Sequence, residues 1–139
     1  MHLPGQIREA MIAHARFSYP EEACGLVAAD GDGRLRMAYC LTNTEGSPVA
    51  FTLDPTEHMR AWRHAERNGW QLAGVFHSHT HTAAFPSRTD VARALEPEWV
   101  YLLVSLERED QPDVRGYWIR DGKVTEEPLV EAEAMETSS

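Results

Sequence analysis

The stretch "GVFHSHTHTAAFPSRTD", residues 74–90, places three histidines and an aspartate directly behind an apolar run. The apolar run predicts a buried strand that starts near residue 70 and ends around the first two histidines. Side chains at positions i and i+2 of a strand point to the same face. His77 and His79 are therefore expected to project together, with Ser78 on the opposite face, and two imidazoles placed in this way can bind one metal ion.

A third ligand for such an ion has to come from a later element, and Asp90 is the best candidate. Residues 80–86 give the chain room to turn back and begin a short helix over 87–95. Two histidines and one carboxylate leave the fourth tetrahedral position open for water, which is typical of catalytic rather than structural zinc sites. The pattern predicts one Zn²⁺ per chain, bound by His77, His79 and Asp90.

Other interpretations of the same residues stay open at this point. A pair of histidines two residues apart is often simply exposed on the surface and binds no metal. Ser87 and Asp90 also fit a capping box at the start of a helix, which would explain both residues without a metal. His81 could be a competing ligand, a hydrogen-bond donor behind the ligands or an exposed loop residue, and the last is favoured.

Hydrophobic periodicity predicts two further helices. Apolar residues at helical spacing, beginning with Ile7 and Met11, indicate a helix over 5–18. A second helix is expected over 55–69, because Asp54 is a good N-cap and proline follows it at the first helical position.

Short apolar runs predict strands. They are expected at 24–30 and 34–40 around a turn at 30–33, at 47–54, at 99–106, and as a pair around the turn at Asp121. Helices and strands alternate without strict βαβ repetition, so we expect the α/β class, with a single mixed sheet flanked by helices. One domain over 1–130 and a disordered acidic tail over 131–139 complete the expected organisation.

Composition excludes several classes of protein. A net charge of −9 without a cluster of Lys and Arg argues against nucleic acid as a partner. No run approaches the roughly 18 apolar residues that span a bilayer. Arg8 and Glu9 interrupt any signal peptide at the start of the sequence, so the cytoplasm is the expected compartment. Cys24 and Cys40 are too few for a disulfide scaffold and are expected to be buried thiols.

A second motif, Glu22-Ala23-Cys24-Gly25, gives the histidine-rich stretch a context. Together the two segments read E-x-C-G, a long gap, then H-S-H-x7-S-x2-D. This pattern resembles the JAMM, or MPN+, family of zinc metallopeptidases, which cleave ubiquitin and ubiquitin-like proteins. The resemblance runs over nearly the whole chain and is closest to a compact bacterial branch, through "HARFSYPEEACG" (14–25), "PSRTDV" (86–91) and "DGKVTEEP" (121–128). Thr80 stands where most of the family has proline.

The resemblance implies a role for each motif residue. His77, His79 and Asp90 would bind zinc. Glu22 would be the general base and then the proton donor to the leaving amine, and Ser87 would donate a hydrogen bond to the oxyanion. Glu21 is the rival base, and the E-x-C-G register favours Glu22. The implied fold is the JAMM/MPN fold, which is distantly like that of cytidine deaminases.

The resemblance also implies a substrate. It would be a small sulfur-carrier protein with a ubiquitin-like fold and a Gly-Gly terminus, from which the enzyme releases a C-terminal cysteine for cysteine biosynthesis. Removal of another extension from such a carrier, or a non-catalytic scaffold, are the alternatives. A deaminase is set aside because its H-x-E and P-C-x-x-C motifs are missing. Exposed apolar surface at Trp99 or Trp118 would be compatible with a homodimer.

Overall fold

The structure, a computed structural model, describes residues 1–131 of the 139 in the chain. Its elements are β1 (His2–Leu3), α1 (Gly5–Ser18), β2 (Cys24–Ala29), β3 (Leu35–Leu41), α2 (Pro55–Arg67), β4 (Gln71–His79), α3 (Arg88–Arg93), β5 (Val100–Ser105), β6 (Asp113–Arg120), β7 (Lys123–Glu127) and β8 (Val130–Glu131). The predicted tail lies outside the described residues apart from Glu131, so its disorder and the domain limit at residue 130 stay predictions.

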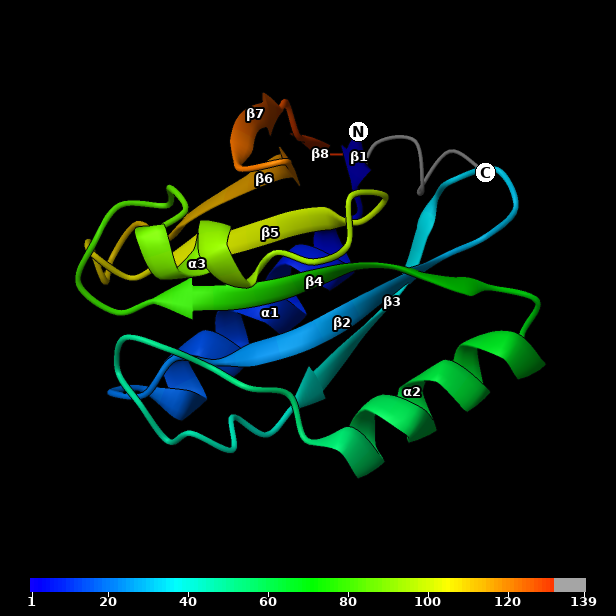
Figure 1. Cartoon of the computed structure of the whole chain (residues 1–139), viewed down its shortest axis with the longest axis horizontal. Helices are drawn as coiled ribbons and strands as arrows, with labels where there is room; N and C mark the ends of the chain where they lie inside the picture. Colours follow the sequence, from blue (N-terminus) through cyan, green and yellow to red (C-terminus); the bar gives the residue numbers. More distant parts are fainter. Residues whose placement is uncertain (132–139) are drawn as a thin grey trace.

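Six strands form one mixed sheet in the order β3-β2-β4-β5-β6-β7 (Figure 1). Only the central pair, β4 and β5, is parallel, and the other neighbours are antiparallel. The parallel pair needs a crossover connection, and this connection contains α3. The predicted mixed sheet flanked by helices is therefore confirmed. A small parallel pair, β1 and β8, joins the first and last strands of the described chain.

Both faces of the sheet are covered, which explains why the central strands β2 and β5 are buried along their whole length. Helix α1 packs on one face, where its residues Met11 and Ala15 join Val27 and Phe76 in one apolar cluster. The other face carries a second cluster, which includes Ala61 of α2. Figure 1 shows α1 behind the sheet and α2 in front of it.

Local signals in the sequence set the ends of α2 and of the β2–β3 hairpin as predicted. The Asp54 side chain accepts hydrogen bonds from the backbone amides of Thr56 and Glu57, which satisfies two amides of the first turn of α2. In the hairpin turn, the Asp30 side chain accepts from the amides of Asp32 and Arg34.

The predicted strand over 47–54 is wrong. This segment is part of a loop, and its one strand-like pairing is an isolated bridge between Leu53 and Asn43, which lies just after β3. The Asn43 side chain replaces a neighbouring strand, because its amide group donates to the Glu22 and Ala50 carbonyls and its oxygen accepts from the amides of Glu45 and Thr52. A side chain that satisfies local backbone groups removes the need for a ladder.

Two expectations about the surface also change. Cys24 is buried as expected, but Cys40 is exposed because β3 is an edge strand. Trp99 and Trp118 are both half-buried and pack against the two apolar clusters, so neither is the exposed apolar surface on which the homodimer expectation rested. Within residues 1–131, no helix is long and apolar enough to cross a membrane.

Candidate metal centre

Strand β4 places both motif histidines on one face of the sheet. His77 lies opposite Cys24 of β2 and Leu103 of β5, and His79 lies at the end of the strand. Both side chains are buried. Ser78 points to the other face, where its hydroxyl oxygen accepts a hydrogen bond of 2.8 Å from the Ala23 amide. The alternation predicted from the sequence is confirmed.

Helix α3 brings Asp90 to the two histidines. Its Oδ2 atom lies 3.1 Å from Nε2 of His77 and 3.0 Å from Nε2 of His79. Two ligand atoms bound at 2.0–2.1 Å to one tetrahedral ion are about 3.3 Å apart, so these separations are close to those of a shared metal ion. Among residues 1–131, these three form the group of potential metal ligands whose donor atoms lie within 4.8 Å of one another.

The polar atoms of His77 provide a separate test of fit. Neither ring nitrogen has a hydrogen-bond partner among the described residues, although Nε2 approaches Asp90 to 3.1 Å. A buried polar atom without a partner is costly. Burial lowers the pKa of His77, although Asp90 acts in the opposite direction. The lowered pKa favours the neutral imidazole ring that a metal requires. The donor set therefore fits a divalent cation.

The other two candidate ligands are electrostatically coupled. Burial acts to raise the pKa of Asp90, but the close approach of His77 and the hydrogen bond with His79 outweigh it and hold that pKa well below its usual range. Burial acts to lower the pKa of His79, yet its hydrogen bonds with Asp90 and with the Ala83 carbonyl raise it overall.

Two neighbours hold the imidazole rings in place. Nδ1 of His79 lies 2.9 Å from the Ala83 carbonyl oxygen, which leaves its Nε2 directed at Asp90. The ring of Phe51 stacks on His77, with centroids 4.6 Å apart and an interplanar angle of 25°. The loop that replaces the expected strand thus covers one side of the candidate ligands.

Glu22 is buried just ahead of β2, with 4% of its surface exposed, whereas Glu21 next to it is exposed. Burial is the main cause that raises the pKa of Glu22 to about 8, with His79 acting in the opposite direction. One carboxyl oxygen has no hydrogen-bond partner in the described part of the chain. Glu22 is therefore the buried carboxyl group of the pair, and it is the one that affects the pKa of His79.

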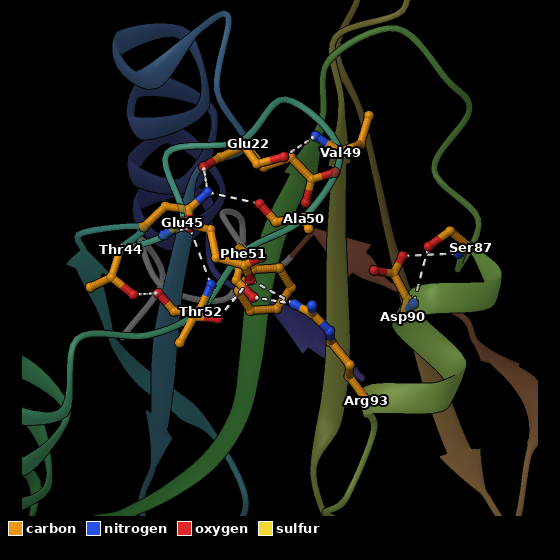
Figure 2. Close-up of polar contacts among 12 residues, drawn as sticks. Glu22, Thr44, Glu45, Val49, Ala50, Phe51, Thr52, Ser87, Asp90 and Arg93 are labelled. Atoms are coloured by element: carbon orange, nitrogen blue, oxygen red, sulfur yellow. Dashed lines mark hydrogen bonds and ion pairs between the residues drawn. The ribbon is translucent and has the colours of Figure 1, made fainter.

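Ser87 and Asp90 form the capping box that was the alternative to a metal site. The Ser87 hydroxyl oxygen accepts from the Asp90 amide at 3.0 Å, and the Ser87 amide donates to Oδ2 of Asp90 at 2.9 Å (Figure 2). The two interpretations are compatible, because the same Oδ2 atom faces both histidines. Ser87 is exposed, and its hydroxyl acts only as an acceptor in the box, so its O–H group remains able to donate to a substrate.

His81 lies away from this cluster. It is exposed in the loop after β4, and its ring meets that of Tyr19 edge-on with centroids 5.7 Å apart. The preferred interpretation of His81 as an exposed loop residue is confirmed.

Sequence reasoning missed the residues of the loop that covers the site. Phe51 lies in the segment that the apolar pattern predicts as a strand. The hydrogen bond from Arg93 to Glu45 ties the loop to α3, and no motif or residue spacing in the sequence indicates it. Figure 2 shows Arg93 reaching from α3 to this loop. The sequence does contain one signal for this loop, which is the asparagine ahead of the apolar run. The Asn43 side chain bonds the backbone of Ala50 and Thr52 and so holds the loop together.

Comparison with known proteins identifies the family. Residues 4–120 match the family described as prokaryotic homologs of the JAB domain. The chain is 45% identical to the CysO-cysteine peptidase of Mycobacterium tuberculosis, over 86% of this chain and 83% of the relative. It is 32% identical to a probable TtuB-protein conjugate cleaving protease of Thermus thermophilus, over 68% of this chain and 63% of the relative.

A solved structure has the same fold as this chain. The solution structure of protein DSY2949 from Desulfitobacterium hafniense has a TM-score of 0.86 to this chain at 38% identity, and covers 95% of this chain and 92% of its own. The family match over residues 4–120 and the identity to a CysO-cysteine peptidase confirm the resemblance noted in the sequence. The chain belongs to the prokaryotic branch of the JAB, or JAMM, domain family.

Proposed function

We propose that this protein is a zinc-dependent peptidase that hydrolyses the C-terminal peptide bond of a ubiquitin-like sulfur-carrier protein and releases cysteine. The observation that carries the proposal is the approach of His77 and His79, through their Nε2 atoms, to one oxygen of Asp90, with Glu22 buried nearby. The 45% identity to a CysO-cysteine peptidase supports the choice of substrate. Cysteine biosynthesis in the cytoplasm is the setting that we propose for this reaction.

His77, His79 and Asp90 are the proposed zinc ligands. When bound, zinc would polarise the scissile carbonyl group and bring the pKa of the attacking water towards roughly 7. Two neutral imidazoles and one carboxylate suit zinc, and the hydrogen bond from His79 to the Ala83 carbonyl keeps the second imidazole oriented.

Glu22 is the proposed general base and acid. Its buried carboxylate would take a proton from the attacking water as the water oxygen bonds to the carbonyl carbon. It would then deliver that proton to the nitrogen as the C–N bond breaks, because an amine leaves a peptide only when it is protonated. The carrier recovers a C-terminal carboxylate, and cysteine is released with a free α-amino group.

Ser87 is the proposed oxyanion donor. The capping box fixes its position at the first turn of α3, and its hydroxyl hydrogen is not used in that box. Donation to the carbonyl oxygen as negative charge develops would stabilise the transition state more than the ground state.

A second candidate substrate is a carrier joined to another protein. The likeness to a protease named for cleaving TtuB-protein conjugates favours it. The same residues would serve, and only the group on the leaving nitrogen would differ.

Intact mass spectrometry tests the proposal. A ubiquitin-like carrier ending in Gly-Gly-Cys is incubated with the protein, with the Glu22→Gln variant and with chelator-treated protein. Loss of one cysteine residue in the first reaction alone is the expected result. If the Gly-Gly-Cys carrier stays whole while a carrier–lysine conjugate is cleaved, the second candidate substrate is the correct one.

A further inference from the structure

Arg93 lies on α3 three residues after Asp90, so the two side chains share one face of the helix. Arg93, Asp90 and His77 all line one small cavity of about 40 Å³, whose apolar wall includes Phe51, Leu103 and Ile119. A water molecule needs roughly 10–15 Å³ of such space. Arg93 and two of the candidate ligands, His77 and Asp90, therefore border the same cavity, which has room for a water-sized group.

The guanidinium of Arg93 is fixed at one corner. Its Nη1 atom donates to the Glu45 carboxylate at 2.6 Å and to the Phe51 carbonyl at 3.1 Å (Figure 2). The Thr52 hydroxyl donates to the same Glu45 oxygen, which holds that carboxylate in turn. Within the described residues, Nε and Nη2 of Arg93 have no hydrogen-bond partner, and about half of its side chain is exposed.

An arginine with a free N–H pair presents the fork that binds a carboxylate through two parallel hydrogen bonds. The substrate of the proposed function has one carboxylate near the scissile bond, which is the α-carboxylate of the C-terminal residue to be released. We propose that Arg93 binds this α-carboxylate and so selects a single C-terminal residue as the leaving group. This inference rests on the proposed function and names a subsite for it.

The competing explanation is that Arg93 only ties the loop over the site to α3, through Glu45. The two roles differ in what they do to substrates that lack a terminal charge. A carboxylate-binding arginine acts on the free acid alone, whereas a structural tie affects every substrate that needs the loop.

The test compares two carriers that differ in one group, one ending in Gly-Gly-Cys with a free carboxylate and one ending in Gly-Gly-cysteinamide. Initial rates of cleavage give kcat/KM for each, with native protein and with three variants. Arg93→Gln removes the charge, Glu45→Gln loosens the tie but keeps the arginine, and Arg34→Gln is a charge-matched control on the exposed β2–β3 turn.

The native protein is expected to prefer the free acid by about 10- to 100-fold, the range typical of a hydrogen-bonded charge pair. Arg93→Gln should lose this preference by slowing the acid far more than the amide, and the amide rate should fall no further than it does in Glu45→Gln. Glu45→Gln and Arg34→Gln should both retain it.

Equal rates for acid and amide with native protein would overturn the subsite and leave the peptidase standing. A parallel fall of both rates in Arg93→Gln, matched by Glu45→Gln, would show that Arg93 is only the tie. If native protein cleaves neither carrier, the proposed function itself fails, so the two failures are distinguishable.

Discussion

Nε2 of His79 lies 3.0 Å from Oδ2 of Asp90, although one atom belongs to strand β4 and the other to helix α3. The crossover between the parallel strands β4 and β5 makes this approach possible, because it returns the chain over the end of β4. The capping box at the start of α3 then fixes the carboxylate. One side chain thus both begins a helix and completes a candidate metal centre.

The first prediction concerns the base. Glu22→Gln should lower kcat by about 10²- to 10⁴-fold, the usual contribution of general acid–base catalysis, because an amide cannot carry the proton. Zinc content should stay at the native level, since Glu22 is not among the three proposed ligands. The measurement pairs carrier cleavage with metal analysis of the same sample. Glu21→Gln is the matched control and should keep nearly full activity, because Glu21 is exposed; an inactive Glu21 variant beside an active Glu22 variant would reverse the assignment.

The second prediction concerns the pH dependence of stability in the metal-free protein. Burial raises the pKa of Glu22 from 4.5 to about 8, so the folded state keeps a proton that the unfolded state loses between these values. The free energy of unfolding contributed by this group is therefore fully present below pH 4.5 and falls as pH rises to 8.

Glutamine is neutral throughout this range and avoids the loss. Denaturant titrations of metal-free native and Glu22→Gln protein should differ least near pH 4, and the variant should become the more stable of the two by pH 8 to 9. A difference that shrank as pH rose would contradict the burial of this carboxyl group.

The third prediction separates two roles of Ser87. Ser87→Ala removes both the cap on α3 and the proposed oxyanion donor. The cap should cost about 0.5–2 kcal/mol of stability, and the donor about 10²- to 10³-fold in kcat. Ser87→Asp supplies a capping oxygen but no hydrogen-bond donor, and should recover stability but not rate. Recovery of both by aspartate would leave Ser87 with a capping role alone.

The fourth prediction explains the glycine of the E-x-C-G motif. A Cβ atom on Gly25 would overlap the carbonyl oxygen of Tyr39 and the ring of Phe76, both in neighbouring strands. Gly25→Ala should therefore destabilise the fold by roughly 1–3 kcal/mol or more, as overpacked cores do. Thermal unfolding measures this, and Gly31→Ala, in the open turn where a Cβ meets nothing, is the control. Equal melting temperatures for the two variants would contradict the close packing at Gly25.

The sequence predicts most of the elements that carry the site, because their signals are local. The bounds of α1, the Asp54 cap and the alternation of His77, Ser78 and His79 all follow from spacing over a few residues, and the structure confirms them. The capping box was also predicted, although its coexistence with the histidine cluster depends on the three-dimensional path of the crossover.

The loop over the site could not be predicted in this way. Its apolar residues follow the pattern of a strand, but Asn43 satisfies the backbone groups that a neighbouring strand would. The contact of Arg93 with Glu45 joins residues 48 positions apart. Contacts between residues so far apart in the chain do not change the local pattern of apolar and polar residues, so that pattern cannot predict them.

The most direct test of the central claim is the zinc content of the purified protein. Native protein and Asp90→Asn are dialysed together against dilute zinc, then against metal-free buffer, and the metal is counted by inductively coupled plasma mass spectrometry. Asparagine keeps an oxygen that can accept from the Ser87 amide, so α3 should still be capped, while the charged ligand is lost. One zinc ion per native chain and a small fraction of that in Asp90→Asn is the predicted result. Native protein without zinc, or a variant that retains as much as the native protein, would contradict the assignment of His77, His79 and Asp90.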